Sequence, residues 1–471
     1  MTKPYHLFRV KDSRFVFHRG AGRFIRVKPE AYELLRLRGE MSAGEAKSAF
    51  LARYPGLDGV IAEVDALEAD GFFEPVGSSL SDAAGFETEL AARIRGTSNN
   101  IVLSVASGCN LACTYCYCGV CRDEIPDQGL MSEETAMRAI DAFLAAADTQ
   151  TDIGITFFGG EPLLNKKVIR KVVERCNAWA ADNGVKAGYS ITTNATLMDD
   201  ETARLIADNG FGLMVSLDGP KELHDGQCPA RSGGGSFDLA MAGIQVLKKY
   251  RTGVTVRCTM AHPAPDAMKL IRFFKDSGFA RVVLGTVSNP TFPSDRDFTP
   301  EDNRVFERCV EDEIIPWMLG ERAEGRVPVY DPFDDIDDFL CEKEHPQKEH
   351  GFRCGACRGA TAVGPDGTFY PCHRFVGMRA WAIGSLDSGL DREKCGNFWR
   401  AHRAASEKSC GSCWAHRVCK GPCPWEIARS DGTFTAPSRI CDETRTWIEQ
   451  GVYYHDQAER LGLNARKEPE R

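Results

Sequence analysis

Cys109-Asn-Leu-Ala-Cys113-Thr-Tyr-Cys116 stands directly after the apolar run Ile101–Ala106, and this stretch decides the fold. A short apolar run bounded by a turn residue is typical of a buried β-strand. The C-x3-C-x2-C spacing places three thiolates on the loop at the carboxyl end of that strand. Three thiolates can bind three irons of a 4Fe–4S cluster and leave the fourth iron open to a small molecule. A structural zinc site is the alternative, but zinc needs four ligands and usually takes C-x2-C pairs.

Around this loop the chain alternates apolar runs with amphipathic segments. The strands expected are Ile101–Ala106, Ile153–Phe158, Ala187–Thr193, Gly212–Leu217, Val254–Met260 and Arg281–Thr286. The helices expected are Ser132–Ala147, Asn165–Asn183, Asp199–Asn209, Ser236–Tyr250 and Ala264–Ser277. Six βα units predict an α/β fold, a partial (β/α)6 barrel over residues 100–290 whose chemistry lies at the carboxyl ends of the strands.

The flanking segments predict four smaller regions and one terminal helix. Residues 1–75 predict a winged-helix-like α+β domain, with strands Tyr5–Val10, Phe15–His18 and Phe24–Val27 before helices Pro29–Leu37, Ser42–Tyr54 and Leu57–Asp70. Residues 76–99 predict a linker and a bridging helix, and 291–350 a helical acidic connector in which Asp331–Asp338 forms a solvated face. Residues 351–445 predict a cysteine-rich iron–sulfur domain with little periodicity, and 446–471 a helix and a frayed tail.

Composition narrows the class of protein. The chain is 43% hydrophobic and 27% charged, which is ordinary for globular domains, and its formal charge of −9 argues against binding nucleic acid or an anionic membrane. No stretch approaches the roughly 20 apolar residues that span a bilayer, and the first residues lack the pattern of a signal peptide. We therefore expect a cytoplasmic protein, in which clustered cysteines are metal ligands or catalytic groups rather than disulfides.

The cysteine loop resembles the signature of the radical S-adenosylmethionine (SAM) superfamily, including an aromatic residue, Tyr115, before the last cysteine. The resemblance continues at Gly159-Gly160-Glu161-Pro162, which ends the second expected strand. In that family this motif holds the amino group of the methionine part of SAM. Glycines permit close approach to the backbone, and a carboxylate pairs with an ammonium group.

Further positions match this family less specifically. Asn194 follows the third expected strand, Ser216 and Asp218 follow the fourth, and Arg257 lies in the fifth. The resemblance implies that Asn194, and Ser216 with Asp218, contact the ribose and carboxylate of SAM and that Arg257 neutralises the carboxylate. Each of these residues is equally compatible with a structural role in a loop or strand. The family also implies an electron donor such as flavodoxin or ferredoxin, reductive cleavage of SAM, and a 5′-deoxyadenosyl radical that takes a hydrogen atom from the substrate.

A second set of cysteines has its own spacing. Cys357, Gly367 and Cys372 read C-x9-G-x4-C, the next four cysteines read C-x2-C-x5-C-x3-C, and Cys441 follows. This pattern resembles the SPASM domain of peptide-modifying radical SAM enzymes, which carries two auxiliary 4Fe–4S clusters. The resemblance implies three 4Fe–4S clusters in all. It assigns Cys410, Cys413, Cys419 and Cys441 to the second auxiliary cluster, and Cys372 and Cys423 with Cys354, Cys357 or both to the first.

Two features point to the substrate. Residues 370–377, Tyr-Pro-Cys-His-Arg-Phe-Val-Gly, resemble a segment of thioether-forming maturases such as that of quinohemoprotein amine dehydrogenase. Residues 1–75 resemble the domain by which ribosomal-peptide maturases bind a leader peptide through strand addition. A stabilising cap and a DNA-binding winged helix are the alternatives for this domain, and the acidic chain argues against the second. We expect residues 1–75 to be separable from the clusters, because no proposed ligand lies in them.

The remaining chemistry-bearing residues stay open at this stage. Asp225 and Asp218 are candidate proton acceptors. Cys118, Cys121 and Cys228 lie near the predicted site and are either functional or ordinary free thiols, and Cys176, Cys258, Cys309, Cys341 and Cys395 are expected to be isolated thiols.

The sequence as a whole therefore predicts a radical SAM/SPASM oxidoreductase that forms thioether crosslinks in a peptide or small protein subunit. Carbon–carbon crosslinking, epimerisation and a metal-sensing winged-helix regulator are the alternatives.

Overall fold

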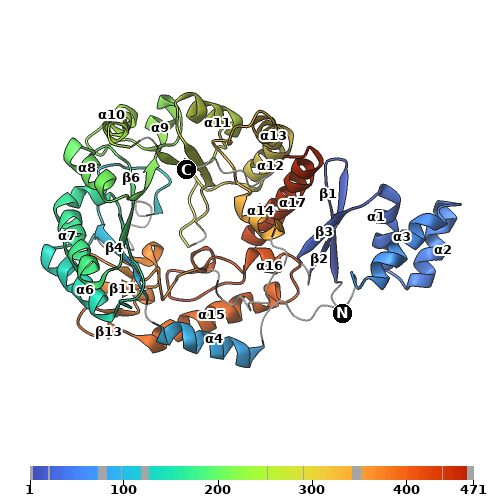
Figure 1. Cartoon of the computed structure of the whole chain (residues 1–471), viewed down its shortest axis with the longest axis horizontal. Helices are drawn as coiled ribbons and strands as arrows, with labels where there is room; N and C mark the ends of the chain where they lie inside the picture. The colour runs from blue at the N-terminus through green and yellow to red at the C-terminus, as the bar shows by residue number, and fades with distance from the viewer. Residues whose placement is uncertain are drawn as a thin grey trace.

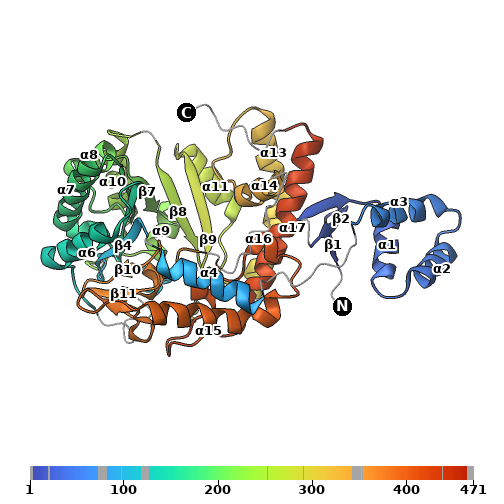
Figure 2. The ribbon, with the colours of Figure 1, turned by 60° about the horizontal axis from the view of Figure 1, so that its bottom comes forward.

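A computed structural model gives the fold of the chain (Figure 1). The structure describes residues 4–19, 22–72, 82–96, 98–117, 127–251, 253–289, 291–341, 352, 354–437 and 439–463. A small N-terminal unit projects from one end of a larger α/β body, and the C-terminal cysteine-rich region lies along one side of that body (Figures 1 and 2). None of the helices in these ranges is long and apolar enough to cross a membrane.

The N-terminal unit is a three-stranded antiparallel sheet followed by three helices. Its elements are β1 (Tyr5–Val10), β2 (Ser13–His18), β3 (Arg23–Arg26), α1 (Pro29–Arg38), α2 (Ala43–Arg53) and α3 (Asp58–Ala69), with strand order β1-β2-β3. Each lies where the sequence predicts it. Proline at the first position starts α1, and Ser42 with Glu45 forms a capping box at α2.

Both faces of this small sheet are buried, because side chains alternate across a strand. Val16 packs into a core with α1, α2 and α3, whereas Phe15 and Phe17 on the same strand pack into the core of the main body. Removal of residues 1–75 would therefore expose apolar surface on the main body as well. Every proposed metal ligand lies outside this unit, and the expectation that the clusters and SAM cleavage survive its removal stays a prediction.

The main body is built on a parallel sheet. The strands β4 (Asn100–Ala106), β5 (Ile153–Gly159), β6 (Ala187–Thr193), β7 (Gly212–Ser216), β8 (Thr255–Met260) and β9 (Arg281–Thr286) pair in sequence order, all parallel. The helices α6 (Glu133–Ala146), α7 (Lys166–Asn183), α8 (Asp200–Asp208), α10 (Phe237–Lys248) and α11 (Ala267–Asp276) lie outside it (Figure 1). This is the predicted mixed α/β fold with a large parallel sheet. The strand pairings do not test whether this sheet curves into a partial barrel, so the barrel stays a prediction.

The sheet continues past β4 in a way that the sequence did not indicate. Short strands of the cysteine-rich region extend it to ten strands in the order β13-β12-β11-β10-β4 to β9. These strands are β10 (Ala362–Val363), β11 (Thr368–Tyr370), β12 (Gly384–Ser385) and β13 (Gly389–Leu390). Since β10 pairs directly with β4, the cysteine-rich region shares a sheet with the strand that precedes the cysteine loop.

Several helices fill the connector, as predicted: α12 (Pro300–Cys309), η2 (Val310–Ile314), α13 (Ile315–Ala323) and α14 (Asp334–Cys341). The solvated face predicted for Asp331–Asp338 is wrong in part. Asp331 is buried in an ion pair with Arg322, and Asp337 Oδ1 lies 2.9 Å from His455 Nδ1. These aspartates pack toward the last helix, α17 (Arg439–Arg460), rather than toward water.

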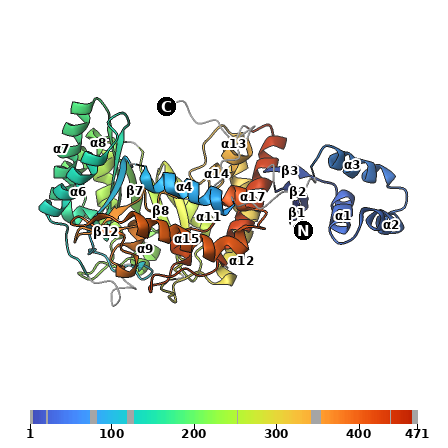
Figure 3. The same ribbon diagram turned by 90° about the horizontal axis from the view of Figure 1, so that it is seen from below.

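The cysteine-rich region contains more helix than its composition indicated. α15 (Arg392–Cys410) runs beside the bridging helix α4 (Ala83–Arg95), and the two lie side by side in Figures 2 and 3. The buried face of α15 carries Cys395, Trp399, His402 and Ser406 rather than aliphatic residues, so its helical period is hard to recognise in the sequence. Phe398 and Trp399 of this helix pack with Phe375, Trp381 and Trp425 in an aromatic core.

Some expectations fall on residues outside the described ranges. They concern Cys118, Cys121, most of the linker between 76 and 81, and the tail after residue 463.

Candidate active site and cluster sites

The loop Cys109–Cys116 leaves the carboxyl end of β4 and is tied to the segment 227–231. Each side chain of the three cysteines is only partly buried, which leaves the sulfurs accessible to a ligand. The ties are Ala112 N–H to Pro229 O, Thr114 N–H to Gln227 O and Arg231 Nε–H to Cys109 O, each at 2.8 Å. The three thiols lie close enough that the charges of Cys113 and Cys116 raise the pKa of Cys109, after burial, which raises it most. The fold therefore brings the predicted cysteines together.

The glycines of the Gly-Gly-Glu-Pro motif hold this loop against β5. A Cβ at Gly159, whose φ is +142°, would lie 2.1 Å from Ala106 O, and a Cβ at Gly160 would lie 2.3 Å from Gly108 O. The backbone N–H of Gly160 and that of Glu161 donate to the same two carbonyls at 2.9 and 3.0 Å. These glycines thus allow the cysteine loop to approach the backbone of β5 closely, whereas the sequence analysis expected them to make room for SAM.

Glu161 is almost fully buried, at 1% exposure. Its Oε1 accepts hydrogen bonds from Leu163 N–H at 2.9 Å and from Thr193 Oγ1 at 2.6 Å, and its Oε2 accepts from Asn194 N–H at 2.8 Å. Burial raises the pKa of Glu161, and these hydrogen bonds oppose the rise. The carboxylate therefore joins the ends of β5 and β6, while contact with the amino group of SAM stays a prediction.

Asn194 links the same strand end to the cysteine loop. Its Nδ2 lies 3.7 Å from Cys109 Sγ and donates to Asn110 Oδ1 at 3.0 Å. Ser216 ends β7 and lies beside Arg257 in the neighbouring strand β8. All of these residues lie at the carboxyl ends of parallel strands, where ligands of α/β sheets bind.

Arg257 brings a positive charge to the carboxyl ends of these strands. A Cβ at Gly285 would lie 2.4 Å from its Nη2, so the glycine in β9 makes room for the guanidinium. Burial lowers the pKa of Arg257, and the charge of Arg374 lowers it further. Within the described part of the chain, no carboxylate forms an ion pair with Arg257. The unpaired Arg257 fits the carboxylate of SAM. The second guanidinium nearby, Arg374, lies 3.5 Å from Glu426 Oε1 and was missed by the sequence analysis although it lies in the segment 370–377.

Asp218 is fully buried in a network next to the cysteine loop. Its Oδ1 accepts from Thr259 N–H at 2.9 Å, and its Oδ2 accepts from Tyr115 Oη at 2.7 Å and from Cys228 Sγ at 3.4 Å. Burial raises the pKa of Asp218, which suits a proton acceptor, and its hydrogen bonds oppose the rise. Tyr115 thus reaches Asp218, and its own part in binding SAM stays a prediction.

Asp218, His224 and Cys228 lie within 4.8 Å of one another in a geometry that could hold a metal ion. The imidazole argues against it, because both ring nitrogens are in use. Nδ1 of His224 accepts from the backbone N–H of Asp218 at 3.1 Å, and Nε2 lies 3.0 Å from Ser236 Oγ. Cys228 Sγ also lies 3.4 Å from Tyr115 Oη, so the structure places this extra thiol against the cysteine loop.

Asp225, the other candidate proton acceptor, has structural contacts. Its Oδ1 accepts from Phe237 N–H at 2.8 Å at the start of α10, and its Oδ2 lies 3.4 Å from Lys221 Nζ. Burial acts to raise the pKa of Asp225, but the hydrogen bond from Phe237 and the charge of Lys221 outweigh it and hold the pKa below its usual value. The proton-acceptor role of Asp225 is an untested prediction.

The cysteines predicted to bind the first auxiliary cluster, called the first auxiliary group below, lie beside α4 and α15. The pKa of Cys372 is raised to about 12 by burial and then by the nearby Cys423 and Cys354. Burial raises the pKa of Cys357, and the nearby Cys395 and Cys372 raise it further. Its φ is +58°, a region that favours glycine. Arg93 of α4 donates to Cys354 O. Cys354, Cys372 and Cys423 therefore come together, and whether Cys357 joins them is still open.

The four cysteines predicted to bind the second auxiliary cluster, called the second auxiliary group below, lie close together. Cys410 ends α15, Cys419 ends the short helix α16 (His416–Cys419), and Cys441 lies in the first turn of α17. These three cysteines and Cys413 line one small cavity. Burial, followed by the charges of the other three thiols, raises the pKa of Cys410 to about 12.

The donor sets fit iron–sulfur clusters. Burial raises the pKa of Cys109, Cys372 and Cys410 to about 12 each, so thiolates form there only when a cation stabilises them. Three or four sulfurs meet at each place, as a 4Fe–4S cluster requires. Arg445 beside the second auxiliary group has a buried Nε–H without a hydrogen-bond acceptor in the described residues, and a cluster thiolate would supply one.

Comparisons with known proteins agree with this geometry. Residues 103–276 match the Radical SAM superfamily. The cysteine-type anaerobic sulfatase-maturating enzyme of Clostridium perfringens (strain 13 / Type A) is 25% identical over 69% of this chain and 88% of its own length. The enzyme of the same name from Clostridium novyi is 23% identical over 75% of this chain and 94% of its own length.

Solved structures show a similar fold. Native anSMEcpe with bound AdoMet and Cp18Cys peptide is 21% identical, with a TM-score of 0.62, and covers 77% of this chain and 99% of its own. SuiB of Streptococcus suis bound to S-adenosylmethionine is 15% identical, with a TM-score of 0.51, and covers 93% of this chain and 98% of its own. The chain therefore carries a radical SAM domain at residues 103–276 and is homologous to anaerobic sulfatase-maturating enzymes.

Proposed function

We propose that the chain is a SPASM-type radical SAM maturase that forms thioether crosslinks in a ribosomally made peptide or small protein subunit. The observation that carries this proposal is the convergence of Cys410, Cys413, Cys419 and Cys441 on one cavity, separate from the cysteine loop after β4. A second set of four thiols with this spacing supports an auxiliary cluster, and the group around Cys372 supports another. The solved structure of anSMEcpe, which has a similar fold, holds a bound Cp18Cys peptide, and this supports a peptide substrate.

The N-terminal unit supports a peptide substrate with a leader. The structural match to SuiB covers 93% of this chain, so the unmatched part is shorter than residues 1–75 and at least part of the N-terminal unit is matched. SuiB has also been solved with its precursor peptide SuiA. β3 pairs only with β2 among the described residues. Its other edge is therefore available for strand addition by the leader peptide, with α3 as the neighbouring helix.

The residues at the carboxyl ends of the strands would bind and orient the cofactor and the substrate. When bound, SAM and the clusters supply the 5′-deoxyadenosyl radical that accepts a hydrogen atom, and an acceptor for the electron released as the sulfur–carbon bond closes. Arg257 and Arg374 would neutralise the carboxylate of SAM, and Asn194 fixes the position of Cys109. Asp218 would take the proton that the substrate thiol loses, and the rise that burial causes in its pKa supports this role.

The test is anaerobic incubation of reconstituted protein with SAM, a reductant and candidate cysteine-containing peptides. A thioether product loses two hydrogen atoms per crosslink, its sulfur resists alkylation, and 5′-deoxyadenosine forms with it. An epimerised product would keep its mass, and a carbon–carbon crosslink would lose two hydrogens but leave the thiol free to alkylate. Absence of SAM cleavage would favour the alternative of a metal-sensing regulator.

The leader site has a matched pair of variants at Arg26. Val27 N–H donates to Arg14 O in β2, so the alternating N–H of Arg26 points to the open edge of β3. Arg26→Pro and Arg26→Ala both lose the ion pair with Asp456, but only the proline loses the outward donor. Leader affinity should fall about tenfold more in the proline variant. Equal affinities would leave the N-terminal unit as a structural cap.

Maturation of a sulfatase is a second candidate, because the relatives with 88% and 94% of their length matched carry that name. A cysteine-containing sulfatase peptide in the same assay distinguishes the two. Modification of that peptide in the absence of any leader would support this second candidate.

A further inference from the structure

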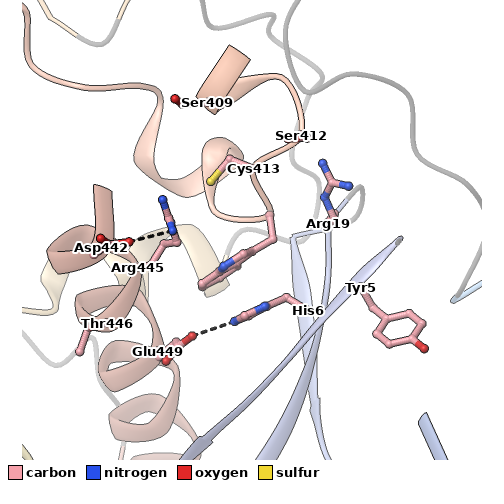
Figure 4. Close-up of a pocket in the computed structure, with 11 residues that line it drawn as sticks. Tyr5, His6, Arg19, Ser409, Ser412, Cys413, Asp442, Arg445, Thr446 and Glu449 are labelled. Carbon is pink, nitrogen blue, oxygen red and sulfur yellow. Dashed lines mark hydrogen bonds and ion pairs between the residues drawn. The ribbon is translucent and has the colours of Figure 1, made fainter. Parts of the chain in front are cut away.

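The N-terminal unit contacts the second auxiliary group across a groove of about 670 Å³ (Figure 4). His6 of β1 stacks on Trp414 with ring centroids 4.1 Å apart and an interplanar angle of 7°. Its Nε2 lies 2.7 Å from Glu449 Oε1 on α17. Trp414 follows the proposed ligand Cys413 directly, so this stack fixes the N-terminal unit next to a cluster ligand.

Arg19 brings a positive charge from the N-terminal unit into this groove. It follows β2 directly, its backbone N–H donates to Pro4 O at 2.9 Å, and it is only 6% exposed. Burial lowers the pKa of Arg19, and a negative charge on Cys413 opposes that change, which places the guanidinium within electrostatic reach of the sulfur. The positive charge of Arg19 would stabilise a cluster thiolate at Cys413.

Arg445 brings a second cation from α17. It lies one turn after Cys441, and its charge opposes the rise that burial causes in the pKa of that thiol. Its Nη1 donates to Asp442 Oδ1 at 3.0 Å. Its Nε is buried and has no acceptor within the described ranges. In Figure 4, Cys413 lies between Arg19 and Arg445. The groove thus presents two guanidinium groups to the sulfurs of one cluster site.

We propose that Arg19 and Arg445 are positioning residues for the second auxiliary cluster, which stabilise its thiolates and raise its reduction potential. This inference rests on the proposed function, because it requires a cluster at Cys410, Cys413, Cys419 and Cys441. Reduction adds negative charge to a cluster, so nearby cations favour the reduced form, and partial burial strengthens the effect. The N-terminal unit is then part of the surroundings of the cluster as well as a recognition domain.

The test uses full-length protein that lacks the SAM cluster, with Cys109, Cys113 and Cys116 changed to alanine, so that only the auxiliary clusters give signals. Arg19→Gln and Arg445→Gln are compared with Lys11→Gln in this background. Lys11→Gln is the control, because it also removes one positive charge from the N-terminal unit. Lys11 forms an ion pair with Asp312, away from the cysteines. Iron content and the potential-dependent electron paramagnetic resonance signal of each cluster are measured.

We expect the ratio of reduced to oxidised second auxiliary cluster, at the midpoint potential of the parent, to fall about tenfold in each arginine variant. Lys11→Gln should leave it unchanged, and Arg19→Lys should restore most of it. Loss of one cluster's iron in the arginine variants alone would also support the role. Full iron and an unchanged potential in both would overturn it. If Cys441→Ala in the same background keeps all its iron, the cluster assignment and hence the proposed function fail instead.

Discussion

The cysteine loop after β4 and the four-cysteine cavity beside α17 are held by different forces. Backbone hydrogen bonds to residues 227–231 and the close approach of Gly159 and Gly160 hold the loop, and a parallel sheet lies beneath it. The cavity is assembled from helix ends, Cys410 at the end of α15 and Cys441 at the start of α17. We therefore expect the sheet to fold without metal and the helix ends to depend on a bound cluster.

The largest expected effect comes from removal of one ligand at each place. Cys410→Ala should lose about a third of the iron and lower the melting temperature by about 5–10 °C, because cluster binding contributes folding free energy there. Cys109→Ala should lose a similar share of iron with little change in melting temperature. Cys309→Ala, which lies outside every proposed site, serves as the control for removal of a thiol. Equal destabilisation by the two ligand variants would contradict the contrast.

The next effect concerns the carboxylate that fixes the cysteine loop. The Glu161 carboxylate accepts three hydrogen bonds. In Glu161→Gln one carboxylate oxygen is replaced by an NH₂ group, which cannot accept a hydrogen bond and would point at another donor. The free energy of unfolding should therefore fall by about 2–3 kcal/mol. Thr193→Val, which removes one donor, should cost about 1 kcal/mol. Denaturant unfolding measures both. If Glu161→Gln unfolds like the parent but binds SAM weakly, the residue contacts the cofactor rather than the fold.

A smaller effect, confined to cofactor binding, is expected at Arg257. Arg257→Gln should raise the dissociation constant of SAM about tenfold through loss of a charge-assisted contact to its carboxylate, with iron content unchanged. Arg257→Lys keeps the charge and should recover part of the affinity. Isothermal titration under anaerobic conditions gives these values. Unchanged affinity in Arg257→Gln would leave Arg374 as the candidate partner of the carboxylate.

The smallest effect is a pH dependence of the packing of α14 on α17. Burial opposes a charge on His455, but the hydrogen bond and the charge of Asp337 outweigh it and raise the pKa of His455. A raised pKa contributes stability below the unfolded value of about 6.5 and loses it as pH rises through the folded value. The free energy of unfolding should therefore fall by about 1 kcal/mol between pH 6 and pH 8.5. His455→Gln should remove that part of the pH dependence.

The sequence predicted those parts of the molecule that are governed by local periodicity or spacing. Strands such as Ala187–Thr193 coincide with β6, and the spacing from Cys410 to Cys441 selected four residues that line one cavity. It could not predict pairings between distant segments, such as β10 with β4 or Asp337 with His455, because no local pattern records them. The position of Arg19 beside Cys413 likewise depends on how two regions pack.

The most direct test of the central claim, that three separate groups of cysteines hold three clusters, is paired measurement of iron and SAM cleavage. Parent protein and a variant with Cys109, Cys113 and Cys116 changed to alanine are reconstituted anaerobically and assayed for iron, zinc and 5′-deoxyadenosine. The variant should form no 5′-deoxyadenosine and keep about two-thirds of the parent's iron. Iron near zero in the variant, or stoichiometric zinc in the parent, would contradict the claim.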